Sequence, residues 1–490
     1  MPEETKTQGT PETAPVPPKP ELKDEIVETE HSVVISGQTI AYTATAGRMV
    51  MKDEEGKAKA TIFFIAYTRK NVEDPSRRPL TISFNGGPGS SSVWMHLGLL
   101  GPRRVLSGDV DNLLPPPYRL ADNDFSLLDV TDLVFVDPVG TGYSRPAPGE
   151  EAKQFHGLEQ DVESVGDFIR LFVTRYKRWS SPKFLIGESY GTTRASALAG
   201  HLQSKYGLYL NGLMLVSVVL NFQTLEFETG NDLPYILYVP AYAATAWYHK
   251  RLAPDLQADL TATVREAAAF AYGEYMSALF QGDALPAEQR AAVVEKLAYF
   301  TGLSSSYVEH SNLRIEHMRF CKELLRDQRR TVGRLDSRFT GADRDAAGET
   351  MTYDPSSAAT YGPYASMLNA YVRDELNFSS DLPYQVLANL WQTWDYGKHQ
   401  NKYVDMSETL RAAMTQNPFL KVIIANGYFD LATPFSATEY TVNHLGLEPH
   451  LRGSVQMAYY EAGHMMYVHD PSLGQLAADL RQFVQQSIPA

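Results

Sequence analysis

The chain has 490 residues, of which 43% are hydrophobic and 21% charged, and its formal net charge is −14. This composition is typical of globular proteins rather than disordered or fibrous ones. The negative charge would repel a nucleic-acid backbone, so nucleic acid is not an expected partner. No stretch approaches the roughly 18 apolar residues that a membrane helix needs, so no membrane span is expected.

Cysteine use narrows the structural class further. Cys321 is the only cysteine, which rules out an intrachain disulfide and a thiolate metal cluster. We expect neither a metal nor a cofactor. The length suits one large α/β domain with an insertion, or two ordinary domains. The oligomeric state leaves no signal in the sequence.

Residues 1–30 form a Pro- and Glu-rich N-terminal segment. Up to about residue 24 it has too little apolar surface to offset its ordering entropy, so we expect disorder. The segment lacks the basic start and apolar centre of a signal peptide. Two interpretations stay open: a cytoplasmic protein with a loose tail, or an exported (periplasmic or secreted) protein whose signal was removed. We favour export, because an acidic, Pro-rich spacer often follows a cleaved signal.

The next part of the chain alternates between strands and helices. Residues 31–69 have a strand-like pattern with a turn at Gly37-Gln38. The apolar strands PLTISF and TDLVFV follow, and each leads into a glycine-rich loop. Residues 157–178 have helical spacing, and the strand KFLI then precedes a helix of small residues and the strand LNGLMLV. This alternation predicts a mostly parallel sheet with helices on both faces.

Between residues 225 and 401 the pattern changes to helix-like stretches with many aromatic residues and few strand-like runs. The alternation returns with the strands KVIIA and SVQMAYY and a closing helix. We therefore predict an α/β core of residues 31–224 and 402–490, with a helical cap inserted over 225–401. An independent second domain is the alternative.

The run GESYG of residues 187–191 fits the G-x-S-x-G nucleophile elbow, with Ser189 on a sharp turn between a strand and a helix. The turn leaves no room for side chains beside the serine, which explains the two glycines. The motif alone is weak, since a chain of this length gives about 0.15 chance matches. The strand before it and the helix after it favour the functional interpretation.

A serine hydroxyl needs a base to remove its proton, and the base needs an acid to fix its tautomer. In folds with this elbow the acid and then the histidine follow the serine along the chain. Asp430 stands in the loop after KVIIA, and His464 follows SVQMAYY. Both positions lie at strand ends, where open α/β sheets hold their sites. We predict Ser189 as nucleophile, Asp430 as orienting acid and His464 as general base.

The glycine-rich loop NGGPG covers residues 85–89. Successive N–H groups in such a loop can donate to the oxyanion of a tetrahedral intermediate. The N–H of Tyr190, next to the nucleophile, is the expected second donor. A phosphate-binding loop does not fit because no Gly-Lys-Ser/Thr follows. The run GTG of residues 140–142 is no dinucleotide fingerprint, because Arg145 occupies the place of the third glycine.

The runs NGGPGSSS, DPVGTGYS, GESYG and the late AGH resemble the serine carboxypeptidases in order and spacing, over about residues 80–225 and 420–470. The resemblance, to a bacterial-type member without disulfides, implies an α/β-hydrolase fold and removal of single amino acids from peptide C-termini through an acyl-enzyme. It puts the oxyanion hole at Gly87 and Tyr190. An acyltransferase or esterase with the same site is the alternative, and the intact triad argues against an inactive binding protein.

The resemblance also implies that Asn85, Gly86 and Glu188 bind the terminal carboxylate of the peptide substrate. A glutamate can hydrogen-bond to a carboxylate only if one of the two is protonated, which favours acidic pH. The family's second glutamate corresponds to Leu99, and its usual cysteine to Ser90.

These departures predict a weaker preference for acidic pH than the family has. Arg103, Arg104 and Arg194 are candidates to compensate for the lost glutamate. The side-chain preference at the scissile bond cannot be read from the sequence.

Overall fold

The computed structural model describes residues 22–488, and within them ten strands form one sheet with the order β1-β2-β3-β7-β4-β9-β10-β13-β14, β8 pairing with β3. Their bounds are β1 Glu25–Ile35, β2 Gln38–Lys52, β3 Ala58–Arg69, β4 Leu80–Phe84, β7 Asp132–Val136, β8 Arg145–Pro146, β9 Lys183–Glu188, β10 Gly212–Val216, β13 Lys421–Gly427 and β14 Val455–Tyr460. From β7 to β14 every neighbouring pair is parallel, whereas β1, β2, β3 and β7 pair antiparallel. The predicted mostly parallel sheet is confirmed.

Short antiparallel pairs lie outside this sheet. They are β5 (Arg103–Leu106) with β6 (Arg119–Asp122), and β11 (Thr331–Val332) with β12 (Thr340–Gly341).

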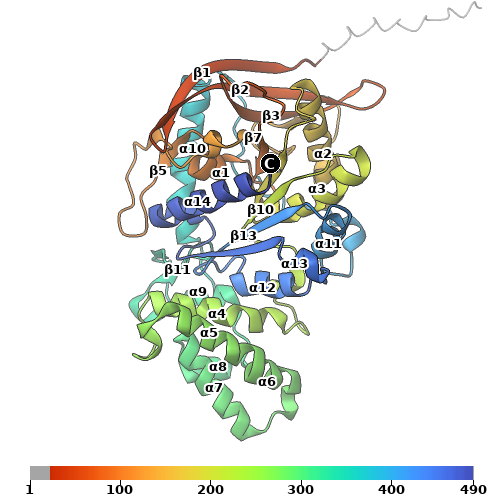
Figure 1. Ribbon diagram of the computed structural model, residues 1–490. Helices are drawn as coiled ribbons and strands as arrows, with labels where there is room; N and C mark the ends of the chain where they lie inside the picture. The colour runs from red at the N-terminus through yellow and green to blue at the C-terminus, as the bar shows by residue number, and fades with distance from the viewer. Residues whose placement is uncertain (1–21, 489–490) are drawn as a thin grey trace, which may run out of the picture.

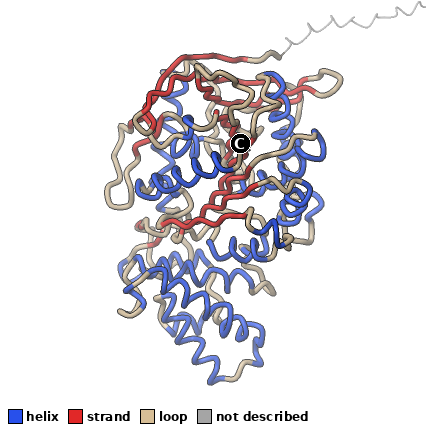
Figure 2. The backbone as a smooth tube through the Cα atoms, viewed as in Figure 1, coloured by secondary structure: helices blue, strands red, loops and turns tan. Residues whose placement is uncertain are grey.

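Helices cover both faces of the sheet (Figures 1 and 2). One face carries α1 (Val93–Met95), α10 (Pro355–Asp374) and α14 (Asp470–Gln486), and the other carries α2 (Leu158–Arg175), α3 (Tyr190–Tyr206), α11 (Ser407–Gln416) and α13 (Pro449–Arg452). Successive side chains of a strand point to opposite faces. In β9, Phe184 and Ile186 accordingly join one apolar cluster and Leu185 the other. Burial on both faces explains why these strands read as continuous apolar runs.

The N-terminal strand corrects one prediction. Residues 1–30 were expected to be disordered, but β1 begins at Glu25 and pairs with β2 along its whole length. Its acidic residues stay toward solvent while Val33 and Ile35 are buried, and Glu25 forms an ion pair with Arg48. The long neighbouring strand supplies the hydrogen bonds that the segment could not supply alone. Residues 1–21 lie outside the described part of the chain.

Helices α4 to α9 form a unit that we call the cap, at the end of the molecule opposite β1 (Figure 1). Their bounds are α4 Leu233–Tyr248, α5 Leu260–Phe270, α6 Met276–Gln281, α7 Ala287–Thr301, α8 Ser305–His310 and α9 His317–Glu323. The apolar cluster of the cap includes Phe429 and Leu431 from the loop after β13 and Phe435 from α12 (Phe435–Asn443). The cap therefore shares its core with the sheet domain instead of standing apart from it.

The second half of the predicted insertion does not belong to this cap. Leu368 and Tyr371 of α10 join the apolar cluster of the sheet domain. The segment 382–396, which we call the strap, lies along the glycine-rich loop after β4: Ser91 N–H donates to the carbonyl of Val386 (3.0 Å), and the strap returns a bond to Gly89 (2.8 Å). Range 225–401 thus contains a cap and a strap, both rich in aromatic residues. No helix among residues 22–488 is long and apolar enough to cross a membrane.

Candidate active site

The residues predicted for chemistry lie at the carboxyl ends of adjacent parallel strands. Asn85 follows β4, Glu188 ends β9, and Asp430 and His464 follow β13 and β14. In the register of the sheet, Val216 of β10 pairs with Glu188 on one side and with β13 on the other. The parallel order therefore brings side chains that are far apart in sequence to one edge of the sheet.

Ser189 stands in a strained turn between β9 and α3. Its φ of 59° and ψ of −130° are unusual for a residue with a side chain, and it is partly exposed. A Cβ on Gly187 would lie 2.1 Å from the carbonyl oxygen of Gly191, and a Cβ on Gly191 would lie 2.8 Å from that of Phe84. Both glycines are thus required by backbone contact, as the motif predicts.

Asp430 and His464 form a buried pair. Nδ1 of His464 lies 2.7 Å from Oδ2 of Asp430, and the two residues are 4% and 0% exposed, respectively. The N–H groups of Ala432 and Thr433 donate to Oδ1 of Asp430 (2.7 and 2.9 Å), and the Thr433 hydroxyl donates to Oδ2 (2.8 Å). These donors fix the orientation of the carboxylate. Its Oδ2 accepts the proton on Nδ1 of His464, which leaves Nε2 able to accept one.

The pKa of His464 is raised above its usual value. Burial acts in the opposite direction, but the charge and hydrogen bond of Asp430 outweigh it, and Glu188 adds to the rise. A base with this shift is protonated at mildly acidic pH, and its activity as a base should grow as the pH rises.

The nucleophile turn and the histidine loop are joined through the end of β10. Ser189 N–H donates to the carbonyl of Val216 (3.0 Å), and the hydroxyl of the next residue, Ser217, donates to the carbonyl of His464 (2.7 Å). The two backbones therefore lie on either side of residues 216–217. Ser217 was not identified from the sequence, because a serine at a strand end has no local signal of such a contact.

Residues 334–336, between β11 and β12, brace the acid and the base. The N–H of Leu431 donates to the carbonyl of Arg334 (3.0 Å), and that of His464 donates to the carbonyl of Leu335 (2.6 Å). The carboxylate of Asp336 accepts from Gly463 N–H (3.3 Å). This contact set was also missed, since it joins segments more than 90 residues apart. Thr433 could have been predicted as a partner of Asp430, because it lies three residues later and Asp and Thr side chains commonly form hydrogen bonds within turns.

The loop of residues 85–89 lies against the start of α3. A Cβ on Gly86 would lie 2.4 Å from the nitrogen of Tyr190, so only glycine allows this approach. Gly87 is exposed, with a φ of 105° that favours glycine. Within residues 22–488, neither Gly87 nor Tyr190 donates its N–H to a recorded protein acceptor. The two predicted oxyanion donors are thus close in space and uncommitted.

Glu188 is buried next to this loop. It is 4% exposed, and Nδ2 of Asn85 donates to its Oε1 (2.8 Å). Burial raises the pKa of Glu188 to about 7, although His464, Tyr467 and Asn85 act to lower it. Near neutral pH the carboxyl group therefore exists in both protonation states.

The arginines proposed to compensate for Leu99 do not reach this carboxyl. Arg194 is 1% exposed, and it donates from Nε to Asp161 (2.7 Å) and from Nη1 to the carbonyl of Asn85 (2.7 Å). Arg103 and Arg104 form ion pairs with acidic side chains near the surface. The prediction that Arg194 compensates for the missing glutamate is wrong, because its guanidinium donates to Asp161 and to the backbone of the loop of residues 85–89.

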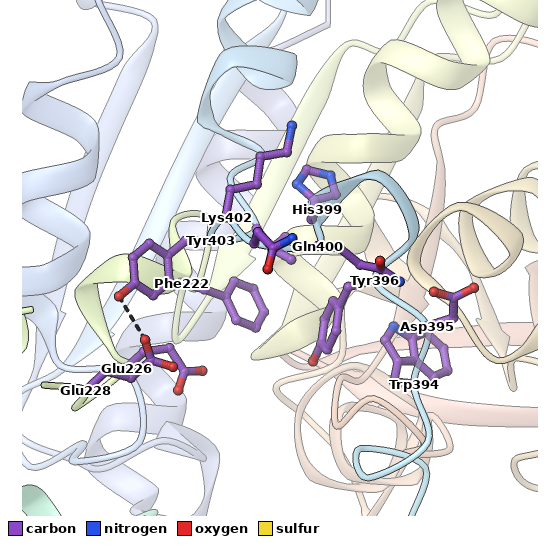
Figure 3. A pocket seen from close by; sticks show the side chains of 12 residues that line it. Phe222, Glu226, Glu228, Trp394, Asp395, Tyr396, His399, Gln400, Lys402 and Tyr403 are labelled. Atoms are coloured by element: carbon purple, nitrogen blue, oxygen red, sulfur yellow. Dashed lines mark hydrogen bonds between the residues drawn. The ribbon is translucent and has the colours of Figure 1, made fainter.

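A cavity of about 740 Å³ is lined by residues from the segments 222–228 and 394–404 (Figure 3). Trp394 lines it and donates from Nε1 to the hydroxyl of Tyr190 (3.0 Å), which links the cavity wall to the residue after Ser189. Phe222 and other aromatic residues form its walls, and Glu226 and Glu228 lie at one side. Burial and then the charge of Glu228 raise the pKa of Glu226. The aromatic walls of the cavity and the two glutamates can contact an aromatic or cationic group, and Asp395 and Lys402 also belong to the lining.

Comparisons with known proteins match most of the chain to one family. The family model described as Serine carboxypeptidase matches residues 38–470. Serine carboxypeptidase S10 family member 1 of Dictyostelium discoideum is 29% identical over 182 residues, which are 36% of this chain and 38% of that protein. Pheromone-processing carboxypeptidase KEX1 of Saccharomyces cerevisiae is 32% identical over 145 residues, 28% of this chain and 19% of that protein. The chain thus matches less than two thirds of either relative.

A solved structure extends the comparison to the fold. The crystal structure of Kex1(delta)p, a prohormone-processing carboxypeptidase from Saccharomyces cerevisiae, superposes with a TM-score of 0.55 at 17% identity and covers 91% of each chain. At this identity the likeness concerns the fold alone, and it confirms the predicted α/β-hydrolase architecture.

Proposed function

The chain belongs to the serine carboxypeptidase family, and we propose that it hydrolyses the C-terminal peptide bond of peptide substrates with Ser189, Asp430 and His464 as its triad. The observation that carries the proposal is the buried 2.7 Å hydrogen bond between His464 and Asp430, at the same sheet edge as the strained turn of Ser189. A held imidazole and an accessible hydroxyl are the parts that acyl transfer needs.

In the first half of the reaction, Oγ of Ser189 attacks the scissile carbonyl carbon while Nε2 of His464 takes the hydroxyl proton. The carbonyl oxygen becomes an oxyanion that accepts hydrogen bonds from the N–H groups of Gly87 and Tyr190. His464 then protonates the leaving nitrogen, the C–N bond breaks, and the C-terminal amino acid departs. Asp430 stabilises the imidazolium at each stage without taking its proton.

In the second half, water attacks the acyl-enzyme and gives its proton to His464. The ester bond to Ser189 breaks, the serine recovers its proton, and the shortened peptide leaves. Exopeptidase action requires a group that binds the free terminal carboxylate, for which we propose Asn85, Gly86 and Glu188. The contact between Asn85 and Glu188, and the raised pKa of Glu188, support this assignment.

The proposal is tested with an N-blocked dipeptide, the matching small ester and a fluorophosphonate probe. We expect the wild type to trim the dipeptide, and the probe to attach to Ser189 in peptide mapping. Ser189→Ala should lower kcat by roughly 10⁴-fold or more. Ser204→Ala is a matched control, since Ser204 is an exposed serine later in the same helix, α3.

Three results would contradict the proposal. A loss of less than tenfold in Ser189→Ala would remove the nucleophile assignment. Labelling of another residue would do the same. Turnover of the ester without any trimming of the dipeptide would instead favour an esterase or acyltransferase that uses the same triad.

A further inference from the structure

Two buried polar atoms close to the proposed carboxylate site have no hydrogen-bond partner within residues 22–488. They are Oε2 of Glu188 and the hydroxyl of Tyr467. Buried polar groups are nearly always satisfied, so each such atom requires an explanation. Tyr467 lies close enough to Glu188 for its hydroxyl to act on the carboxyl group as a hydrogen-bond donor. A hydrogen bond from the Tyr467 hydroxyl to Oε2 of Glu188 would satisfy both atoms at once.

The position of Tyr467 is fixed by its packing. Its ring lies against Gly98, where a Cβ would be only 2.4 Å from Cδ2 and 2.5 Å from Cε2 of the ring. Gly98 precedes Leu99 in a π-helical turn of fully buried residues. The missing side chain at position 98 makes the room that the phenol occupies. The phenol of Tyr467 is thus a neutral O–H donor held beside Glu188. Leu99, which stands at the position of the family's second glutamate, supplies no carboxylate.

We propose that Tyr467 is a positioning residue that donates its phenol O–H to Glu188, and so sets the pH range in which the enzyme binds the carboxylate of its substrate. This inference rests on the proposed function. The donor stabilises the ionised form of Glu188, which repels a substrate carboxylate, and the protonated form is the one that can donate a hydrogen bond to it. Tyr467 therefore keeps carboxylate binding from extending to alkaline pH.

Other groups around Glu188 also affect its ionisation and must stay constant in a test. Those facing it are His464, Asp430, Asn85 and Tyr364. The pKa of His464 is raised as well, and His464 is needed for every substrate. The test therefore compares kcat/KM for two substrates, a blocked dipeptide with a free carboxylate and the same dipeptide as a C-terminal amide. The ratio of the first value to the second cancels the contribution of His464.

The experiment measures this ratio from pH 5 to pH 9 in the wild type, Tyr467→Phe and Gly98→Ala. In the wild type we expect the ratio to fall as the pH rises through the pKa of Glu188. In Tyr467→Phe the fall should move upward by about one pH unit, since a hydrogen bond to a charged group is lost. Gly98→Ala, which displaces the ring, should move the fall in the same direction.

Tyr371→Phe is the matched control, because it removes a buried phenol O–H that bonds to Tyr67 (2.9 Å) away from this site. It should leave the fall of the ratio unchanged. A purely structural defect would lower both rates at every pH, whereas the proposal requires Tyr467→Phe to exceed the wild type in the ratio at pH 8.

The outcomes separate the two proposals. If the wild type trims the free peptide but the fall does not move in Tyr467→Phe and Gly98→Ala, or moves downward, this inference is overturned alone. If the wild type trims neither substrate, the proposed function is overturned and this inference falls with it.

Discussion

Arg194→Met tests how the fold holds the loop of residues 85–89 against the nucleophile turn. The guanidinium pairs with Asp161, and the two side chains are 1% and 2% exposed. It also donates to the carbonyl of Asn85 (2.7 Å), and Cζ lies 5.5 Å from the ring centroid of Tyr190. One side chain therefore touches the loop that carries one proposed oxyanion donor and the residue that carries the other.

The magnitude follows from the burial of the pair. Removing one partner of a buried ion pair leaves an uncompensated charge and costs about 3–5 kcal/mol of stability. Burial already raises the pKa of Asp161, with Arg194 acting against that rise, so the lone carboxyl would tend to take up a proton. The free energy of unfolding of Arg194→Met, measured in urea, should fall by an amount in this range.

A double variant separates stability from catalysis. Arg194→Met combined with Asp161→Leu removes the pair as a whole, and such replacements are often close to neutral. We expect most of the stability to return. The carbonyl of Asn85 still lacks its donor, so kcat/KM for a blocked dipeptide should stay about 10- to 100-fold below the wild type, as for other displaced catalytic groups.

Recovery of both stability and kcat/KM in the double variant would refute this reasoning. Arg194 would then serve only to neutralise Asp161. A stable Arg194→Met single variant with wild-type activity would refute it as well, because neither the charge nor the loop would depend on the guanidinium.

Two further predictions concern binding. Glu188→Gln should make the preference for a substrate with a free carboxylate over its C-terminal amide independent of pH between 5 and 9, because the glutamine side-chain N–H donates at every pH in this range. A fall of this preference near pH 7, like that of the wild type, would contradict the pKa of Glu188. The cavity of Figure 3 should receive a side chain next to the scissile bond. Glu226→Gln with Glu228→Gln should then lower kcat/KM for a lysine there by about tenfold relative to leucine, and an equal effect on both substrates would argue against this use of the cavity.

Local sequence patterns predicted the sheet and the proposed triad because local geometry determines both. The turn at Ser189 needs glycine at 187 and 191, and the backbone contacts of 2.1 and 2.8 Å explain why no other residue fits. Asp430 and His464 could be selected because each follows a strand of the parallel sheet, and parallel strands end at a common edge. The order of the strands was enough to predict that these two side chains would lie close together.

The limits of the cap and the supports of the site could not be predicted in the same way. The apolar residues of α10 and those of α4 look alike in the sequence, although α10 packs on the sheet domain and α4 on the cap. What separates them is the partner surface, which no local pattern encodes. The acidic start of β1 was misread for a related reason, since its order depends on pairing with β2.

The arginine candidates show the same limit at the site itself. From the sequence, Arg194 was one of three arginines that could compensate for the glutamate missing at Leu99, with a solvated surface arginine as the alternative. In the fold, the guanidinium of Arg194 donates to Asp161 and to the carbonyl of Asn85. Next to Glu188, an unpaired donor among the described residues is the uncharged hydroxyl of Tyr467. Recognition of a carboxylate by neutral donors and a protonated acid avoids burying a permanent positive charge, and its cost is dependence on pH. Under the proposed assignment, the ionisation of Glu188 is therefore the quantity on which both carboxylate binding and its pH range depend.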